Sequence, residues 1–438
     1  MDPLKNLKTL SVKKMSLKPF SLFGWIGVLI LLSSCASVTP TPLPPEKATP
    51  PPSEKPATTP SEKPTLSPTE KPAVWQLVPN DQWPDMADDL DYGGLERAVS
   101  QSLTYLRNRA KEQTFFLGTR HVSTEDLAAT LRLFLKILKE EGNGKAREQR
   151  IRTHFDLYWM IQDSLPLPLL VTGYYEPSLK GSRAPSPRFN YPIYRLPDDF
   201  IFIHPEKFSP TIPAQRWVGR LEGNQVLPYY TRKEIDQEGR LAGKKLEILW
   251  VDDPMKLFFL HIQGSGEVSL EDGSVVKLGY HGANGHPYFA IGRDLVRRGL
   301  FKPEEISLQS IYTYLQNHPE ERQALMNLNA SYVFFKENRG GPFGSLGRPL
   351  TPGRSVAMDL KVFPPAGLAW LKGDLPAINN RGEIGPRVPL GRWVCLQDSG
   401  GAIRGPTRLD LFWGKGPEAE LIAGHLRHPG TIFFLLKK

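Results

Sequence analysis

Short apolar runs bounded by proline and glycine characterise the middle of this chain. Four of them cover residues 169–175, 191–196, 246–251 and 257–262. Apolar runs of this length between turn-forming residues are typical of β-strands. The pattern predicts a barrel or a sandwich, and the sequence from residue 331 to the C-terminus is expected to be rich in strands as well. The stretch of roughly 360 residues after the N-terminal region is too long for one ordinary core and suggests two domains.

Helical periodicity appears in four other segments, residues 94–111, 123–141, 287–298 and 304–317. In the second segment Ser123 is a candidate N-cap, with Asp126 at the position that completes a capping box. Four apolar residues recur there at helical spacing and are expected in the core: Leu127, Leu131, Phe134 and Leu138.

The first 35 residues have the features of a secretory signal. Five lysines precede an apolar stretch at residues 20–32, which is shorter than the roughly 20 residues of a spanning helix. Residues 32–35 then resemble a bacterial lipobox, which predicts cleavage and acylation at Cys35. The alternatives are an uncleaved anchor or a cysteine present by chance. No acid follows Cys35, which favours an outer membrane, facing the periplasm, if the cell has one.

Residues 36–74 are rich in proline, threonine and serine and contain a loose Glu-Lys-Pro repeat. Such a tract buries little surface and extends by about 3 Å per residue where it adopts polyproline geometry. We expect a disordered linker that holds a folded part away from a membrane. Docking of a partner protein on the proline-rich tract is the less favoured alternative.

Charge and composition exclude some functions. The formal net charge is +9, with both signs interspersed along the chain, so nucleic acid is not expected as a partner. His281 and His286 lack a third ligand or helical spacing, and we expect no metal and no cofactor. With Cys35 acylated, Cys395 would have no disulfide partner and is expected to be a small buried residue.

Two aspartates, Asp398 and Asp410, bracket a glycine-rich turn near the C-terminus. Residues 409–413 have the pattern of a mostly buried strand, which is expected to hold Asp410 in apolar surroundings. Burial disfavours the charged form of a carboxyl group and raises its pKa, so Asp410 is a candidate general acid. For either aspartate alone, hydrogen bonding to backbone amides of the turn is the simpler interpretation. Asp359 occupies a similar apolar run before a Pro-Pro turn.

These residues carry a family resemblance. Residues 355–424, with Asp359, Asp398 and Asp410, resemble the 3D domain, which is named for three aspartates. Together with the motifs at residues 171–177, 259–266 and 285–288, they resemble the membrane-bound lytic murein transglycosylase A family. The resemblance extends in the same order from about residue 75 to the C-terminus.

The resemblance implies a mainly β fold with flanking helices. Its first domain would be a six-stranded double-psi β-barrel formed by residues 75–176 and 332–438, with the 3D domain at about 355–438. A second β-rich domain, residues 177–331, would be inserted between the two parts. A glycan strand of peptidoglycan would bind in the groove between the domains.

The resemblance also implies an activity, the cleavage of peptidoglycan between N-acetylmuramic acid and N-acetylglucosamine without water, leaving 1,6-anhydromuramic acid. The C6 hydroxyl of the sugar is then the nucleophile, so one carboxyl group can act first as acid and then as base. Asp410 matches the catalytic aspartate of the family and Asp398 its close companion. Thr172, Gln263, Tyr174 and Asp359 are candidate substrate contacts, although we favour a structural role for Asp359 in its turn.

Two other functions were weighed. The segment Asp398-Ser399-Gly400-Gly401 echoes the nucleophile segment of trypsin-like proteases, but no histidine has a recognisable triad context. A non-catalytic peptidoglycan-binding lipoprotein would share every binding residue and lack only an active proton donor. Expected partners are peptidoglycan strands, a membrane through the lipid anchor, and proteins of cell-wall synthesis or division. Whether cleavage is exolytic or endolytic, and whether it needs stem peptides, stays open at this level.

Overall fold

The computed structural model describes residues 72–109, 114–142, 144–209, 211–379 and 381–438. The expected signal segment, the lipobox with Cys35 and the linker up to residue 71 lie outside the described residues. Across the described ranges, no helix combines the length and the apolar character needed to cross a membrane.

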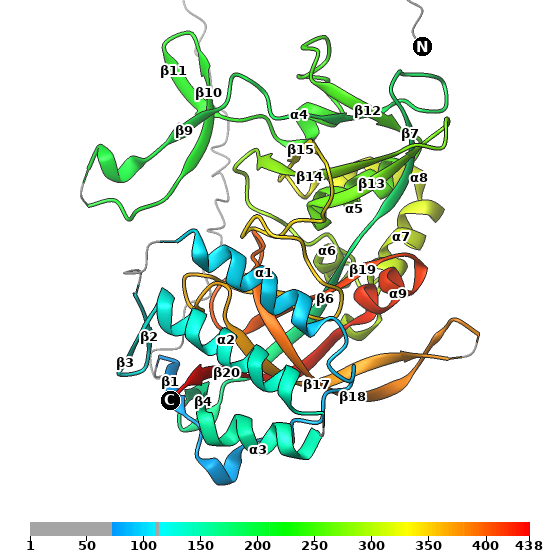
Figure 1. Ribbon diagram of the computed structural model, residues 1–438. Coiled ribbons are helices and arrows are strands. Elements are labelled where there is room, and N and C mark those ends of the chain that lie inside the picture. Colours follow the sequence, from blue (N-terminus) through cyan, green and yellow to red (C-terminus); the bar gives the residue numbers. More distant parts are fainter. Residues whose placement is uncertain (1–71, 110–113, 143, 210, 380) are drawn as a thin grey trace, which may run out of the picture. The chain divides into compact units, whose positions relative to one another are not determined.

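The largest sheet has nine strands and contains a closed barrel (Figure 1). Its strands are β1 (Val74–Leu77), β4 (Phe155–Gln162), β5 (Leu165–Pro166), β6 (Leu169–Glu176), β16 (Ser355–Ala357), β17 (Leu368–Ile378), β18 (Ile384–Asp398), β19 (Arg408–Lys415) and β20 (Arg427–Lys437). Six of them pair in the order β20-β17-β18-β16-β19-β6, and β6 pairs again with β20. The predicted mainly β fold with a closed six-stranded barrel is confirmed.

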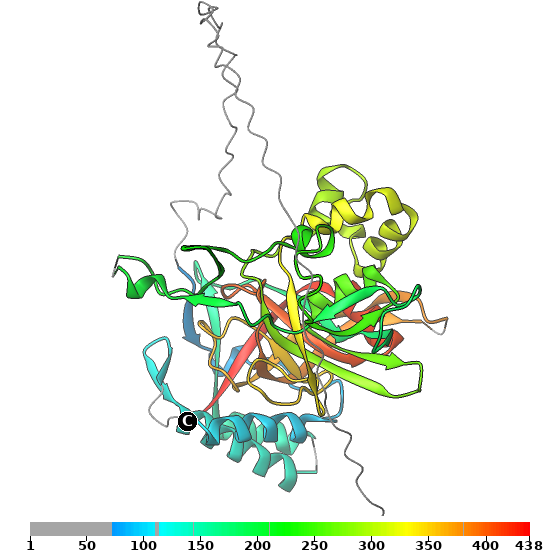
Figure 2. The ribbon, with the colours of Figure 1, turned by 90° about the horizontal axis from the view of Figure 1, so that it is seen from above.

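The barrel strands contribute large buried apolar side chains to the main core, among them Trp370, Trp393 and Phe434. Cys395 on β18 is fully buried in the same core, and burial raises the pKa of its thiol to about 12. Three helices flank the barrel: α1 (Leu95–Arg107), α2 (Thr124–Glu140) and α3 (Gly144–His154). Helices α1 and α2 lie side by side, and they contact β18 and β20 respectively (Figures 1 and 2).

Helix α2 follows its predicted pattern closely. The Ser123 hydroxyl accepts a hydrogen bond from the Asp126 amide (3.1 Å), and the Asp126 carboxylate accepts one from the Ser123 amide (2.8 Å), so the capping box is confirmed. Leu127, Leu131 and Phe134 are buried in the barrel-side core, as predicted. Leu138 packs against the same core but is only partly buried. The strands β2 (Thr114–Leu117) and β3 (Arg120–Ser123) form a short hairpin before α2.

The second large sheet has six strands in the order β15-β14-β13-β7-β12-β8 and encloses its own apolar core. The strands are β7 (Ser178–Ser182), β8 (Tyr191–Tyr194), β12 (Glu247–Val251), β13 (Ser265–Leu270), β14 (Val275–Ala283) and β15 (Val333–Asn338). Strand β15 belongs to this sheet, although the expected boundary at residue 331 put it in the first domain. A separate three-stranded sheet consists of β9 (Ile201–Ile203), β10 (Trp217–Glu222) and β11 (Gln225–Pro228).

Residues 257–262 were expected to form a strand, and this prediction is wrong. They belong to α5 (Pro254–Gln263), which begins where the Asp253 carboxylate accepts hydrogen bonds from the amides of Met255 and Lys256. The helix is buried on nearly all sides, so its apolar residues show no one-sided helical period. The N-cap aspartate followed by proline was the local signal for a helix.

The remaining helices are α4 (Arg232–Asp236), α6 (Gly292–Arg297), α7 (Leu308–Asn317), α8 (Pro319–Asn327) and α9 (Pro417–His425). Helices α6 and α7 fall within the predicted helical segments, but α6 is much shorter than expected. The C-terminal part is rich in strands as predicted, except that α9 connects β19 to β20.

A buried ion pair ties the chain before α1 to the barrel. Arg354 donates a hydrogen bond from each terminal nitrogen to one carboxylate oxygen of Asp88, and both distances are 2.7 Å. Neither side chain is exposed. The Trp393 amide adds a third hydrogen bond to Asp88 (3.1 Å). Burial alone would raise the pKa of Asp88, but the hydrogen bond and charge of Arg354 lower it below the usual value.

Replacing Asp88 by alanine would leave the Arg354 guanidinium buried without its counter-charge. We expect Asp88→Ala to lower the free energy of unfolding by about 3–5 kcal/mol in urea denaturation. Asp81→Ala, at an exposed acid of the same segment, should change it by no more than about 0.5 kcal/mol. Because the pKa of Asp88 is lowered by folding, its contribution is complete above the ordinary aspartate pKa. It is lost as the pH falls through the lowered value. A loss below about 1 kcal/mol at neutral pH, typical of an exposed pair, would contradict this role.

Candidate active site

Five residues on five adjacent barrel strands form one lateral row. Ala357 on β16 pairs with Asp398 on β18 and with Asp410 on β19. Asp410 pairs in turn with Thr172 on β6, and Thr172 pairs with Arg427 on β20. Directly opposed residues project on the same face of a sheet, and neighbouring strands are about 4.8 Å apart. The α-carbons of Asp398 and Asp410 are therefore about 10 Å apart, with only the small Ala357 between them.

Asp410 is held by polar groups. The Thr172 hydroxyl donates a hydrogen bond to Oδ1 of Asp410. Arg408 donates from Nε to Oδ1 (3.0 Å) and from Nη2 to Oδ2 (3.2 Å), and the Asp410 side chain is 15% exposed. The expectation of apolar surroundings is therefore wrong. Strand alternation explains it, because Leu409 and Leu411 are fully buried while Asp410 shares the other face with Arg408.

Asp398 has a different environment. Its Oδ1 accepts hydrogen bonds from the amides of Ser345 (2.7 Å) and Ser399 (2.8 Å), and its Oδ2 accepts one from the Tyr174 hydroxyl (2.9 Å). Burial raises the pKa of Asp398, and these hydrogen bonds oppose the shift without cancelling it. Both carboxylate oxygens of Asp398 are thus engaged by protein donors.

Tyr174 donates to Asp398 and lies near enough to Asp410 to feel its charge. It lies two residues after Thr172 on β6, on the same face, and its ring packs against Phe412 with centroids 5.2 Å apart. Burial raises the pKa of the Tyr174 hydroxyl, and the negative charges of Asp398 and Asp410 raise it further. The hydroxyl is therefore a persistent donor to Asp398.

The third aspartate organises loops. Oδ1 of Asp359 accepts a hydrogen bond from the Lys361 amide (3.0 Å), and Oδ2 accepts one from the Gly405 amide (2.8 Å). The second bond reaches the glycine-rich turn between Asp398 and Asp410, so Asp359 fixes both its own turn and that loop. This geometry matches the favoured structural interpretation of Asp359.

A cavity of about 490 Å³ opens beside the row, within the range of ordinary ligand sites. Thr172 and Arg408 line it from the barrel, and Gln263 and Tyr288 line it from the segment that carries the six-stranded sheet. Gln263 is the last residue of α5, and its Oε1 accepts a hydrogen bond from the Tyr175 amide (3.1 Å). The structure thus brings Thr172 and Gln263 to one cavity, next to Asp410.

Sequence reasoning missed two residues of this site. Arg408 is the direct partner of Asp410, and its position two residues earlier on the same strand was a signal that could have revealed it. Tyr288 belongs to a motif that contributed to the resemblance but received no role. Burial raises the pKa of the Tyr288 hydroxyl. The charge of Arg408 opposes this shift and the charge of Asp410 adds to it, because Tyr288 lies close to both groups.

Metal ligands do not gather in the part of the chain that the structure describes. No three histidine, cysteine, aspartate or glutamate residues there are close enough to hold an ion. Nε2 of His286 lies 2.6 Å from the carbonyl oxygen of Tyr229, to which it donates a hydrogen bond.

Two family descriptions match the chain. The MltA specific insert domain matches residues 170–336, and the 3D domain matches residues 354–436. The membrane-bound lytic murein transglycosylase A of Escherichia coli (strain K12) is 33% identical over 267 residues. That alignment covers 60% of this chain and 64% of the relative, so the match spans slightly less than two thirds of the relative's length.

Solved structures extend the match over most of the described residues. A membrane-bound lytic murein transglycosylase from Agrobacterium tumefaciens superposes with a TM-score of 0.68 at 30% identity, covering 83% of this chain and 98% of that one. Escherichia coli MltA with bound chitohexaose superposes with a TM-score of 0.61 at 26% identity, covering 82% and 93%. The matched 3D domain contains Asp359, Asp398 and Asp410, and the chain belongs to the membrane-bound lytic murein transglycosylase A family, with a 3D domain.

Proposed function

We propose that this chain is a lytic transglycosylase that cleaves the β-1,4 bond between N-acetylmuramic acid and N-acetylglucosamine in peptidoglycan and forms 1,6-anhydromuramic acid ends. The observation that carries the proposal is the row Asp398-Ala357-Asp410-Thr172 beside a cavity whose lining includes the hydrogen-bonding side chains of Thr172, Gln263, Tyr288 and Arg408. The names of the relatives support the substrate class, since they are lytic murein transglycosylases and one solved member holds chitohexaose.

The difference between the two carboxyl groups supports a reaction without water. A hydrolase needs a second carboxylate that activates water or attacks the sugar carbon. Asp398 is poorly suited to that task, because two amides and the Tyr174 hydroxyl already engage its oxygens. Asp410 then acts alone, and Asp398 positions Tyr174 and the loop that contains Ser345.

In the proposed reaction Asp410 donates a proton to the glycosidic oxygen as the bond from C1 of the muramic acid to that oxygen breaks. The resulting carboxylate takes the proton of the C6 hydroxyl as O6 bonds to C1, which restores the acid. Arg408 donates hydrogen bonds to both carboxyl oxygens of Asp410. We infer that bound substrate displaces Arg408 from at least one oxygen before the proton is donated.

Substrate contacts follow from the cavity. Gln263 offers an amide for sugar hydroxyl and acetamido groups, and the Thr172 hydroxyl holds the orientation of Asp410. Tyr174 would act through Asp398, and Asp359 through the glycine-rich loop. Because Thr172 and Gln263 come from the barrel strand β6 and from α5, the glycan would bind between the barrel and the inserted domain proposed for residues 177–331.

One observation favours a second function, a peptidoglycan-binding lipoprotein without catalysis. Arg408 contacts both carboxyl oxygens of Asp410 in the substrate-free arrangement. If that contact persisted with bound glycan, the cavity would hold the strand without donating a proton.

We also propose that the chain is anchored through an acylated Cys35 and faces the periplasm from the outer membrane. The lipobox-like residues 32–35 support the anchor, and the relatives are named membrane-bound. Several acyl chains hold a protein stably at a membrane where one chain gives only marginal binding.

The first prediction from the proposed function concerns Asp410. Asp410→Asn removes the proton donor while keeping the side-chain shape, so we expect the release of soluble fragments from purified peptidoglycan to fall about 10²- to 10⁴-fold. Binding to insoluble peptidoglycan should persist. Asp163→Asn is a matched control at an exposed turn position with φ of 51°, which asparagine tolerates, and its activity should be unchanged. Equal activity of Asp410→Asn and wild type would refute the proposed acid.

The second prediction concerns Tyr174. Tyr174→Phe removes one of the hydrogen bonds that oppose the burial of Asp398, so the pKa of Asp398 should move further upward. Carboxyl-labelled aspartate followed by NMR through a pH titration measures this shift. Tyr175→Phe is the neighbouring control, because its hydroxyl does not contact Asp398 and the pKa should stay in place. An unchanged Asp398 pKa in Tyr174→Phe would show that the hydroxyl contact has no electrostatic effect.

The third prediction concerns the anchor. In the full chain, Cys35→Ala should prevent acylation and move the protein from the membrane fraction to the soluble fraction of the envelope. The cleavage of purified peptidoglycan should not depend on this change, since the site residues lie far from Cys35 in the sequence. Retention of Cys35→Ala in the membrane fraction would point instead to an uncleaved hydrophobic anchor.

A further inference from the structure

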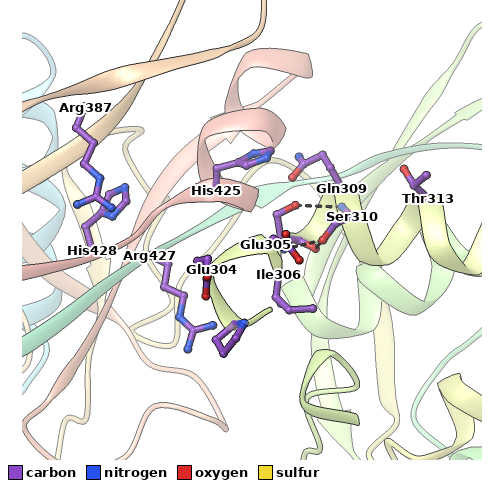
Figure 3. Close-up of a pocket in the computed structure, with 12 residues that line it drawn as sticks. Glu304, Glu305, Ile306, Gln309, Ser310, Thr313, Arg387, His425, Arg427 and His428 are labelled. Carbon is purple, nitrogen blue, oxygen red and sulfur yellow. Dashed lines mark hydrogen bonds between the residues drawn. The ribbon is translucent and has the colours of Figure 1, made fainter. Parts of the chain in front are cut away.

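A second cavity, of about 760 Å³, has walls of opposite charge (Figure 3). The barrel wall carries Arg387 from β18 and Arg427 and His428 from β20. The opposite wall comes from the inserted segment and carries Glu304 and Glu305, which lie in the short 3-10 helix η3 (Pro303–Glu305). Hydroxyl and amide groups of α7 complete that wall: Ser310, Thr313 and Gln309.

The charges on these walls are largely unpaired within the described residues. Neither Arg387 nor Arg427 forms an ion pair there, and the same holds for Glu304. Glu305 accepts a hydrogen bond from the Lys302 amide (2.8 Å). Unpaired guanidinium groups at a concave surface are the preferred protein partners of carboxylates.

His428 is an independent sign of a missing ligand. It is only 8% exposed, it lines the cavity, and its Nδ1 has no hydrogen-bond partner among the described residues. Burial, and next the charge of Arg387, lower the pKa of His428. A buried polar nitrogen without a partner costs free energy, which a ligand would recover.

The second cavity adjoins the first. Both are lined by Pro303, Ile306, Ser307 and Arg427. Arg427 stands in the lateral row directly beside Thr172, two strands from Asp410. The α-carbons of Asp410 and Arg427 are therefore about 10 Å apart. A peptide attached to a sugar at Asp410 would therefore reach the second cavity after a few residues of its own chain.

We propose that the second cavity binds the stem peptide of the peptidoglycan strand, with Arg387 and Arg427 contacting its carboxylates and Glu304 its amine. This inference rests on the proposed function, since the peptide is attached to the muramic acid whose bond is cleaved. A stem peptide carries free carboxylates and, on its diamino acid, an amine, which matches walls of opposite charge. At about 3.3 Å per residue, its second to fourth residues span the distance from Asp410.

The test compares two substrates, glycan strands with stem peptides and the same strands stripped of peptide by an amidase. Arg387→Glu reverses a charge that lines only the second cavity. We expect its kcat/KM on peptide-bearing strands to fall about tenfold more than on stripped strands, as expected for a lost charged hydrogen bond. Arg387→Lys should recover most of this loss. Arg381→Glu, on an exposed arginine of the same hairpin, is the matched control and should not discriminate between the substrates. An equal fall on both substrates, or none, would overturn the inference.

Binding of the free stem tetrapeptide, measured by calorimetry on the full chain in detergent, separates this inference from the proposed function. If the wild type cleaved neither substrate, the proposed function would fail, and peptide binding would still decide the role of the cavity. Binding by the wild type that Arg387→Glu weakens about tenfold supports the inference. No binding, or equal binding by both proteins, overturns it.

Discussion

The pairing of β20 with β6 is the constraint on which the site depends. It closes the six-stranded barrel and sets Arg427 beside Thr172, and the remaining pairs then align Asp410, Ala357 and Asp398 in the same row. A shift of one residue in any of these pairings would turn alternate side chains to the opposite face of the sheet. The Thr172 hydroxyl would then no longer meet Asp410. The arrangement of this row is therefore a property of barrel register rather than of a local motif.

Within this frame the two aspartates have separate tasks. Asp398 is satisfied by amides and by Tyr174, so it holds the loops and strands around it in place. Asp410 is partly exposed and is held by two side chains that line the first cavity, Thr172 and Arg408. The two adjoining cavities also differ in their linings. The first offers mainly uncharged groups suited to sugars, and the second offers unpaired charges suited to a peptide.

Much of this fold could be predicted from local sequence, and the failures have definite causes. Strands β6, β8 and β12 and helix α2 follow their apolar patterns, because each buries one face or one short run. Helix α5 was mistaken for a strand, since burial on nearly all sides removes the helical period. The polar surroundings of Asp410 escaped prediction because Thr172, which holds it, is 238 residues away in the sequence. Which residues meet across β6 and β19 is decided by register, which no short motif encodes.

The central claim is that the C6 hydroxyl of the muramic acid, and not water, attacks C1 of the same sugar when Asp410 protonates the glycosidic oxygen. Digestion of purified peptidoglycan in ¹⁸O-labelled water, followed by mass spectrometry of the new chain ends, tests it most directly. We predict anhydromuramic acid ends that contain no oxygen from the solvent. New reducing ends that carry one ¹⁸O atom for each bond cleaved would contradict the account, because they require a water nucleophile and a second carboxylate to activate it.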